Sequence, residues 1–192
     1  MKLTSPKGIA QYPWLNRPDT KFDELGAYKV NLIVSKEDAQ PFIKQILDGF
    51  VGEFGSKVKP NSLPWVEETD DQGNATGNVV LRYKNQNKRK RDGEFWDRKP
   101  IILNSDLEKT DDVIGAGSSI RVATEVYYWD YNGKKGFTLQ IVKVQILDLK
   151  EPQTMDTDDF GLKPEPGYKG KTESLDDEEI FPVSSEGEDS LF

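Results

Sequence analysis

The clearest hydrophobic pattern along the chain is an alternating stretch that leads directly into a helical one. Apolar side chains fall on alternate positions of residues 26–34 (GAYKVNLIV), which predicts a strand with one buried face. Ser35, with Asp38 three residues later, is typical of a helix N-cap. Apolar residues then recur every three or four positions, and Gly55 favours an end there. The pattern predicts an amphipathic helix over residues 36–54.

A second strong pattern predicts a long β-hairpin in the last part of the folded region. Alternation over residues 119–131 predicts a strand, and Asn132-Gly133 is a strong signal for a two-residue turn. Residues 136–149 predict the returning strand. Within it the apolar residues change parity between Ile141 and Val142, which favours a β-bulge or a bend.

Weaker patterns predict the remaining elements. Residues 79–84 indicate a strand, residues 94–104 a strand or a pair of strands interrupted by Pro100, and residues 63–67 a short extended piece. Together, these patterns predict about five strands and one substantial helix, and the sequence shows no internal repeat. Because one helix alone lies among the strands, a small antiparallel barrel is favoured over alternating strands and helices.

Charge divides the chain into two parts. The net charge is −8, but residues 1–150 hold 23 basic and 21 acidic side chains, whereas residues 151–192 hold 3 basic and 13 acidic ones. A segment this charged buries too little apolar surface to offset the entropy of ordering it. We therefore expect a folded domain over 1–150 and a disordered acidic tail over 151–192. Such a tail can serve solubility alone, but an apolar island at 180–183 and the terminal Phe192 suit docking on a basic partner.

Composition excludes several classes of enzyme. The chain has no cysteine and no histidine, so it has no thiol nucleophile, no Ser-His-Asp triad and no histidine-containing zinc site. The adjacent carboxylates at 70–71 and 111–112 fit turn chemistry, and there is no P-loop. No apolar run is long enough to span a membrane and no signal peptide is apparent, so we expect a soluble intracellular protein. We expect no enzymatic activity, cofactor or metal; a nuclease with carboxylate-bound metal is a distant alternative.

The predicted strand over residues 119–131 carries aromatic side chains on the face that should meet solvent. Tyr127, Trp129 and Tyr131 share that face, opposite the apolar positions. Nucleic-acid bases stack on exposed aromatics. The competing interpretation is that a second layer or a dimer partner covers this face. The aromatics at 12–14 and Trp65 fit packing better than stacking.

Residues 82–99 form a basic segment that suits phosphate binding. They hold 8 basic and 3 acidic side chains, with aromatic residues among them. Phosphate neutralisation gives affinity without sequence preference. The candidate phosphate-binding residues are Lys29, Arg82, Lys84, Lys88, Arg89, Lys90, Arg91, Lys134 and Lys135. The candidate base-stacking residues are Trp96, Tyr127, Trp129 and Tyr131.

These motifs together resemble the single-stranded-DNA-binding proteins of tailed bacteriophages, of the podophage replication type. The residues that carry the resemblance are GAYKVNLIV with the following helix, Lys59-Pro60 with Leu63-Pro64-Trp65, IGAGSSIRV, VYYWDYN, and the acidic tail with its final Phe192. The resemblance implies an OB-fold: a mainly β, five-stranded antiparallel barrel with one long helix. It also implies that Trp129 and Tyr131 stack bases. The tail here is less densely acidic than the resemblance implies, and the basic loop is more concentrated.

The resemblance further implies sequence-independent binding of single-stranded DNA in phage replication, recombination and repair. It implies a homodimer in the cytoplasm of the infected bacterial host, away from membranes. By the same resemblance, the acidic tail would compete with DNA for a basic DNA-binding groove and would recruit the phage DNA polymerase and primase-helicase. The tail residues expected to bind partners are Asp176, Asp177, Glu178, Glu179, Glu186, Glu188, Asp189 and Phe192. The alternatives are a protein-interaction module that uses the aromatic face and an RNA-binding OB-fold.

Overall fold

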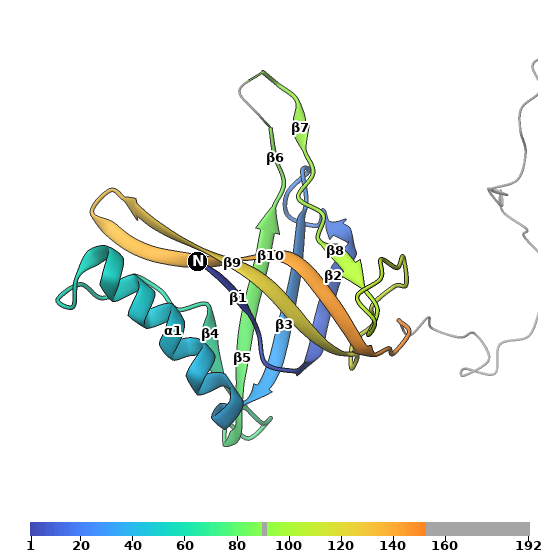
Figure 1. Ribbon diagram of the computed structural model, residues 1–192, viewed down its shortest axis with the longest axis horizontal. Helices are drawn as coiled ribbons and strands as arrows, with labels where there is room; N and C mark the ends of the chain where they lie inside the picture. Colours follow the sequence, from blue (N-terminus) through green and yellow to red (C-terminus); the bar gives the residue numbers. More distant parts are fainter. Residues whose placement is uncertain (90–91, 153–192) are drawn as a thin grey trace, which may run out of the picture. The chain divides into compact units, whose positions relative to one another are not determined.

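A strongly bent β-sheet with one helix against it makes up the described part of the chain, residues 1–89 (backbone alone at Arg89) and 92–152 of the computed structural model (Figure 1). The main sheet has eight strands in the order β4-β5-β3-β2-β9-β10-β8, and β1 also pairs with β9. Its strands are β1 (Lys2–Thr4), β2 (Gly8–Asp19), β3 (Ala27–Ser35), β4 (Trp65–Thr69), β5 (Ala75–Gln86), β8 (Ile101–Leu103), β9 (Ser119–Tyr131) and β10 (Lys134–Asp148). A separate ribbon pairs β6 (Lys88–Arg89) with β7 (Phe95–Trp96).

The helix α1 (Lys36–Phe54) begins and ends where the sequence predicts. The Ser35 hydroxyl accepts a hydrogen bond from the Asp38 N–H at 3.1 Å, which satisfies one of the free donors of the first turn. Gly55 follows the last turn with a φ of 87°, a conformation that glycine adopts without strain. Among the described residues, no helix is long and apolar enough to cross a membrane.

The β9–β10 hairpin also forms as predicted. Asn132 and Gly133 have φ angles of 50° and 75°, as a type I′ turn requires at its two central positions. The register shifts between Ile141 and Lys143, so Val142 is left unpaired and points toward solvent. This bulge allows both Ile141 and Val144 to be buried, which confirms the predicted change of parity.

The N-terminal strands β1 and β2 and the short β6 are elements that the sequence patterns do not predict. β2 contains Pro13 and Pro18, and prolines are unfavourable inside a sheet because they lack an N–H donor. Its pairing with β3 is interrupted between Gln11 and Trp14 and again before Asp19, which accommodates both prolines. The mainly β fold class with one helix is confirmed, with more strands than expected.

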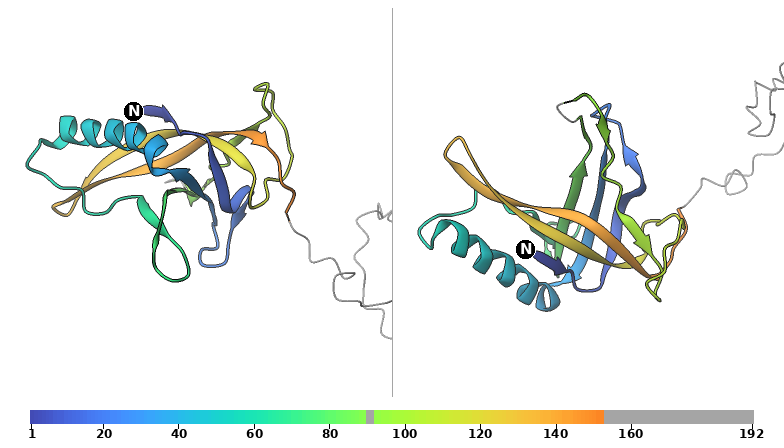
Figure 2. Two further views of the ribbon diagram at one scale, coloured as in Figure 1. Left: turned by 90° about the horizontal axis from the view of Figure 1, so that it is seen from below. Right: turned by 45° about the horizontal axis from the view of Figure 1, so that its top comes forward.

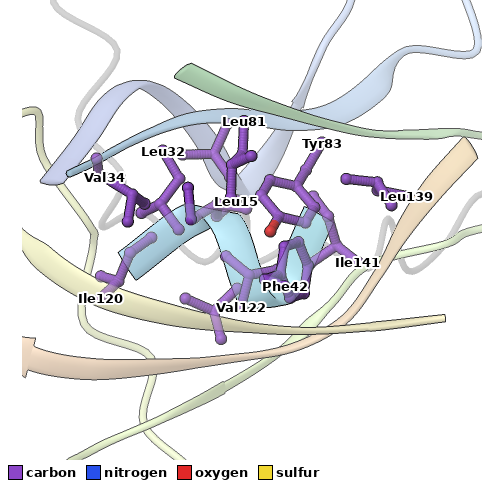
Figure 3. Packing of buried hydrophobic residues seen from close by; sticks show 14 of the residues in the cluster. Leu15, Leu32, Val34, Phe42, Leu81, Tyr83, Ile120, Val122, Leu139 and Ile141 are labelled. Atoms are coloured by element: carbon purple, nitrogen blue, oxygen red, sulfur yellow. The ribbon is translucent and has the colours of Figure 1, made fainter. Parts of the chain in front are cut away.

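The core lies between the two halves of the bent sheet and the helix. The β9–β10 hairpin crosses the β2–β3–β5 strands (Figure 2). Both views in Figure 2 show α1 and the N-terminus on the same side of this hairpin. Figure 3 shows Leu15, Leu32 and Leu81 on one side of this core, and Ile120 and Val122 on the other together with Phe42 of α1. Among the described residues, no ladder of backbone hydrogen bonds joins β5 to β10, so the barrel is open between these two strands. The open side is where the candidate site lies.

Candidate nucleic-acid interface

Alternation along β5 builds a basic row on its outer face. Alternate residues point to opposite faces of a strand. The outward, exposed side chains are Arg82, Lys84, Gln86 and, continuing into β6, Lys88. The inward, buried side chains are Tyr83, Asn85 and Asn87. The outer face therefore presents positive charge, while the inner face carries two buried amides that need hydrogen-bond partners.

The β9–β10 hairpin supplies an aromatic face. Tyr127 is 57% exposed and Tyr131 is 71% exposed, so among the described residues no layer covers this face. Trp129 is half-buried because its indole lies over Gly136, the residue directly opposite on β10. A Cβ atom at position 136 would lie 2.3 Å from Trp129 Cζ2. Gly136 therefore provides the space in which Trp129 is held.

A groove with a volume of about 670 Å³ lies between the basic row and the aromatic face. Basic and aromatic side chains line it together with a few polar and apolar ones. Its lining residues are Pro64, Arg82, Lys84, Gln86, Lys88, Trp96, Arg98, Tyr127, Trp129, Thr138, Leu139 and Gln140. The predicted residues that the structure brings together here are Arg82, Lys84, Lys88, Trp96, Tyr127 and Trp129. Aromatic rings and cations thus face the same space, the combination that suits single-stranded nucleic acid.

Trp96 and Arg98 form a paired unit in this groove. The Arg98 guanidinium carbon lies 5.3 Å from the centroid of the Trp96 ring, within cation–π range. Arg98 Nη2 also donates to Gln140 Oε1 at 2.6 Å. Burial lowers the pKa of Arg98, but a guanidinium stays protonated at neutral pH. The indole, half exposed, is therefore held beside a fixed positive charge.

Buried polar groups fix the backbone that carries this unit. Asn87 Oδ1 accepts from the Arg98 N–H at 2.9 Å, and Asn85 Nδ2 donates to the Arg98 carbonyl at 3.1 Å. Asn85 also replaces the missing ladder: its Nδ2 donates to the Ile141 carbonyl at 2.6 Å and its Oδ1 accepts from the Ile141 N–H at 2.8 Å. The Tyr28 hydroxyl bonds to Asp97, and burial together with this contact raises the pKa of Tyr28 to about 12. The segment after β7 is therefore anchored on both sides.

Several of these residues were missed by the sequence analysis. Arg98 belongs to the basic segment, and its position two residues after Trp96 is the signal that would have singled it out. Asn85 and Asn87 have the inward parity of β5, where a polar side chain calls for a partner. Gln140 has no comparable signal, because its role depends on the pairing of β9 with β10.

Other candidate residues lie outside the groove. Lys29 forms an ion pair with Asp19. The hydrogen bond that Lys29 donates within this pair lowers the pKa of Asp19. Lys135 pairs with Asp130 at 2.6 Å and lies over the Phe54 ring at 4.7 Å. Lys134 and Tyr131 share the face of Trp129 but lie closer to the hairpin turn.

The remaining candidates cannot be placed. Lys90, Arg91, the Arg89 side chain and every predicted tail residue from Asp176 to Phe192 lie outside the described residues. Within the described part of the chain, no cluster of three or more acidic side chains is arranged to hold a metal ion.

Comparisons with known proteins identify the fold. No model of a protein family and no curated protein sequence matches the chain. The solved structure of gp2.5, a single-stranded DNA binding protein encoded by bacteriophage T7, superposes with a TM-score of 0.58 at 19% identity, covering 78% of this chain and 92% of that one. The single-stranded DNA-binding protein from bacteriophage Enc34, in complex with single-stranded DNA, superposes with a TM-score of 0.57 at 17% identity, covering 79% and 88%. The chain therefore has the fold of these phage single-stranded DNA-binding proteins.

Proposed function

We propose that the protein binds single-stranded DNA without sequence preference in the groove between β5 and the β9–β10 hairpin. The observation that carries the proposal is the composition of that groove: Trp96, Tyr127 and Trp129 line the same continuous space as the cations of the basic row. The fold shared with phage single-stranded DNA-binding proteins supports the same substrate.

The proposed mechanism divides the work between two kinds of side chain. Aromatic rings stack on base faces, and every base has such a face, so the contact tolerates any sequence. The cations neutralise phosphates and release counterions. A duplex keeps its base faces stacked on one another and cannot offer them to the rings, so the groove selects for single strands.

Tryptophan fluorescence tests this proposal directly. Oligo-dT should quench the fluorescence strongly, and a duplex of equal length should quench it little. The four cations that line the groove, Arg82, Lys84, Lys88 and Arg98, correspond to a slope of about −3 in a plot of log affinity against log salt. That slope is a loss of roughly 50-fold between about 50 and 200 mM salt. Equal response to the duplex, or affinity that does not change with salt, would contradict the proposal.

We also propose that this binding serves phage DNA replication, recombination and repair, in a homodimer within the infected host cell. The shared fold supports the proposal, because the matching structures are of phage proteins. A non-enzymatic role fits the groove, because the described residues that line it are mostly cationic, aromatic and amide-bearing and include no carboxylate.

The acidic tail is proposed to regulate the groove and to recruit the phage DNA polymerase and primase-helicase. Its support is charge: 13 acidic and 3 basic side chains over residues 151–192, opposite in sign to the groove. An acidic segment competes with DNA phosphates for the same cations. DNA would displace the tail and free Phe192 for a partner.

Deleting residues 172–192 is expected to tighten binding of oligo-dT at low salt and to abolish recruitment. The deleted segment holds eight carboxylates and no Lys or Arg. A matched variant, with these carboxylates changed to the corresponding amides, separates charge from length and should tighten DNA binding to the same extent. Titration at low salt measures both effects. Unchanged affinity in the deletion variant would rule out competition between tail and DNA.

A further inference from the structure

The outer face of the sheet continues past the groove toward the N-terminal strand β2. Strand pairing aligns Lys84 of β5 with Lys29 of β3, and Lys29 with Trp14 of β2. Residues that are directly opposite in a ladder share a face. Since neighbouring strands are about 4.8 Å apart, Trp14 lies roughly 10 Å beyond Lys84 along this row. The row therefore leads from the groove through Lys84 and then Lys29, which is held in its ion pair with Asp19, to an indole on another strand.

A bulge in β2 turns its aromatic residues onto this face. Gln11 pairs with Asn31 and Trp14 pairs with Lys29, so Tyr12 and Pro13 together stand opposite Val30 alone. Tyr12 has a φ of 51°, an uncommon conformation for a residue other than glycine, and its side chain is 66% exposed. The extra residue brings Trp14 to the outer face while the next residue, Leu15, stays in the core. Packing alone does not account for an exposed tyrosine held in a strained conformation.

The surface around this bulge repeats the chemistry of the groove. The Arg17 guanidinium lies 5.3 Å from the centroid of the Trp14 ring, the same separation as that of Arg98 from Trp96. Lys21 lies 5.4 Å from the centroid of Phe22, which is 86% exposed. The carboxylate of Asp19, which lies beside Lys21 and Phe22, is neutralised by its ion pair with Lys29.

Two hollows flank the aromatic residues of the bulge. Tyr12 and Trp14 line both of them. One has a volume of about 480 Å³ and is also lined by Lys21, Phe22 and Lys29. The other has a volume of about 610 Å³ and extends to Arg17 and Val113. The aromatic rings thus stand beside open space on either side, with cations at its edges.

We propose that Tyr12, Trp14 and Phe22 form a second base-stacking site, reached by the same DNA strand after it leaves the groove and crosses Lys84 and Lys29. This inference rests on the proposed function and extends it: the binding path covers two aromatic sites rather than one. Short oligonucleotides fill the groove alone, whereas longer ones gain additional affinity from the second site.

The test compares two oligonucleotide lengths on the full-length protein. A dT oligomer of about six nucleotides fits one aromatic site and one of about twelve spans both, within the range known for barrels of this type. The measured quantity is the ratio of the two affinities. Trp14→Ala and Phe22→Ala should each reduce that ratio, by roughly 5- to 150-fold for a well-stacked ring. Phe22 is almost fully exposed, so its replacement tests the site without disturbing the fold.

A matched control and a second readout make the result decisive. Val51→Ala removes an exposed apolar side chain from α1, away from both sites, and should leave the ratio as in the wild type. Light scattering reports the molar mass of each variant. If Trp14→Ala and Phe22→Ala both keep the wild-type ratio while the wild type still binds the short oligomer, the second site is overturned and the proposed function stands. If the wild type binds neither oligomer, the proposed function itself fails. A changed molar mass with an unchanged ratio would assign the surface to contacts between copies and overturn the inference.

Discussion

Replacing Trp129 with alanine is expected to weaken binding of a short oligo-dT by roughly 5- to 150-fold, equivalent to about 1–3 kcal/mol for the loss of one stacked base. Trp129 lines the groove across from the basic row and is half-buried, so little entropy is lost when a base stacks on it. The measurement is the anisotropy of a labelled oligomer at fixed salt. Circular dichroism would show whether the variant remains folded.

Tyr131→Ala is the matched comparison for this variant. Tyr131 lies on the same strand face as Trp129 but outside the groove. Its removal should therefore cost far less affinity for a short oligomer. If Trp129→Ala instead preserves DNA affinity and changes the molar mass of the protein, the aromatic face is a protein interface, which is the alternative left open by the sequence.

Gly136 offers an independent perturbation of the same indole. Gly136→Ala would place a methyl group 2.3 Å from Trp129 Cζ2, so the ring must move although it is still present. The expected effect on affinity has the same direction as that of Trp129→Ala. Unchanged affinity in Gly136→Ala, together with a large loss in Trp129→Ala, would mean that the ring binds DNA from more than one position.

The sequence predicts those parts of the fold that are set by local signals. The helix α1 follows from the Ser35 cap, the apolar spacing and Gly55, all contained within residues 35–55. The β9–β10 hairpin follows from alternation and Asn132-Gly133. By contrast, β2 is formed through pairing with β3 and β9, and its two prolines mask that pattern.

The candidate groove is predicted in part, for the same reason. Alternation correctly separates Arg82 and Lys84 from the buried side of β5. It does not indicate which cations are already paired: Lys29 is held by Asp19 and Lys135 by Asp130. Those pairs, like the contact of Arg98 with Gln140, depend on strand register and are set by the tertiary structure.

Replacing Asn85 with alanine is expected to destabilise the folded domain by about 3 kcal/mol. Asn85 is 2% exposed, and its amide bonds both the N–H and the carbonyl of Ile141 and also the carbonyl of Arg98. Each buried polar group left without a partner costs about 1–3 kcal/mol. For a domain of this size the melting temperature should fall by roughly 6–12 °C. The control is Asn31→Ala on the neighbouring strand, where the amide is half-buried and makes one long hydrogen bond to Gln11 at 3.4 Å.

The isosteric variant Asn85→Asp separates lost hydrogen bonds from lost volume. It keeps the shape of the side chain but turns a second acceptor toward the carbonyl oxygens of Ile141 and Arg98. Two acceptors facing each other in a buried site repel, so Asn85→Asp should be at least as unstable as Asn85→Ala at neutral pH. Because Asn85 also holds the segment that carries Trp96 and Arg98, both variants should bind oligo-dT more weakly below their melting temperatures. Wild-type stability in Asn85→Asp, measured by thermal unfolding, would show that this amide does not hold β5 and β10 together.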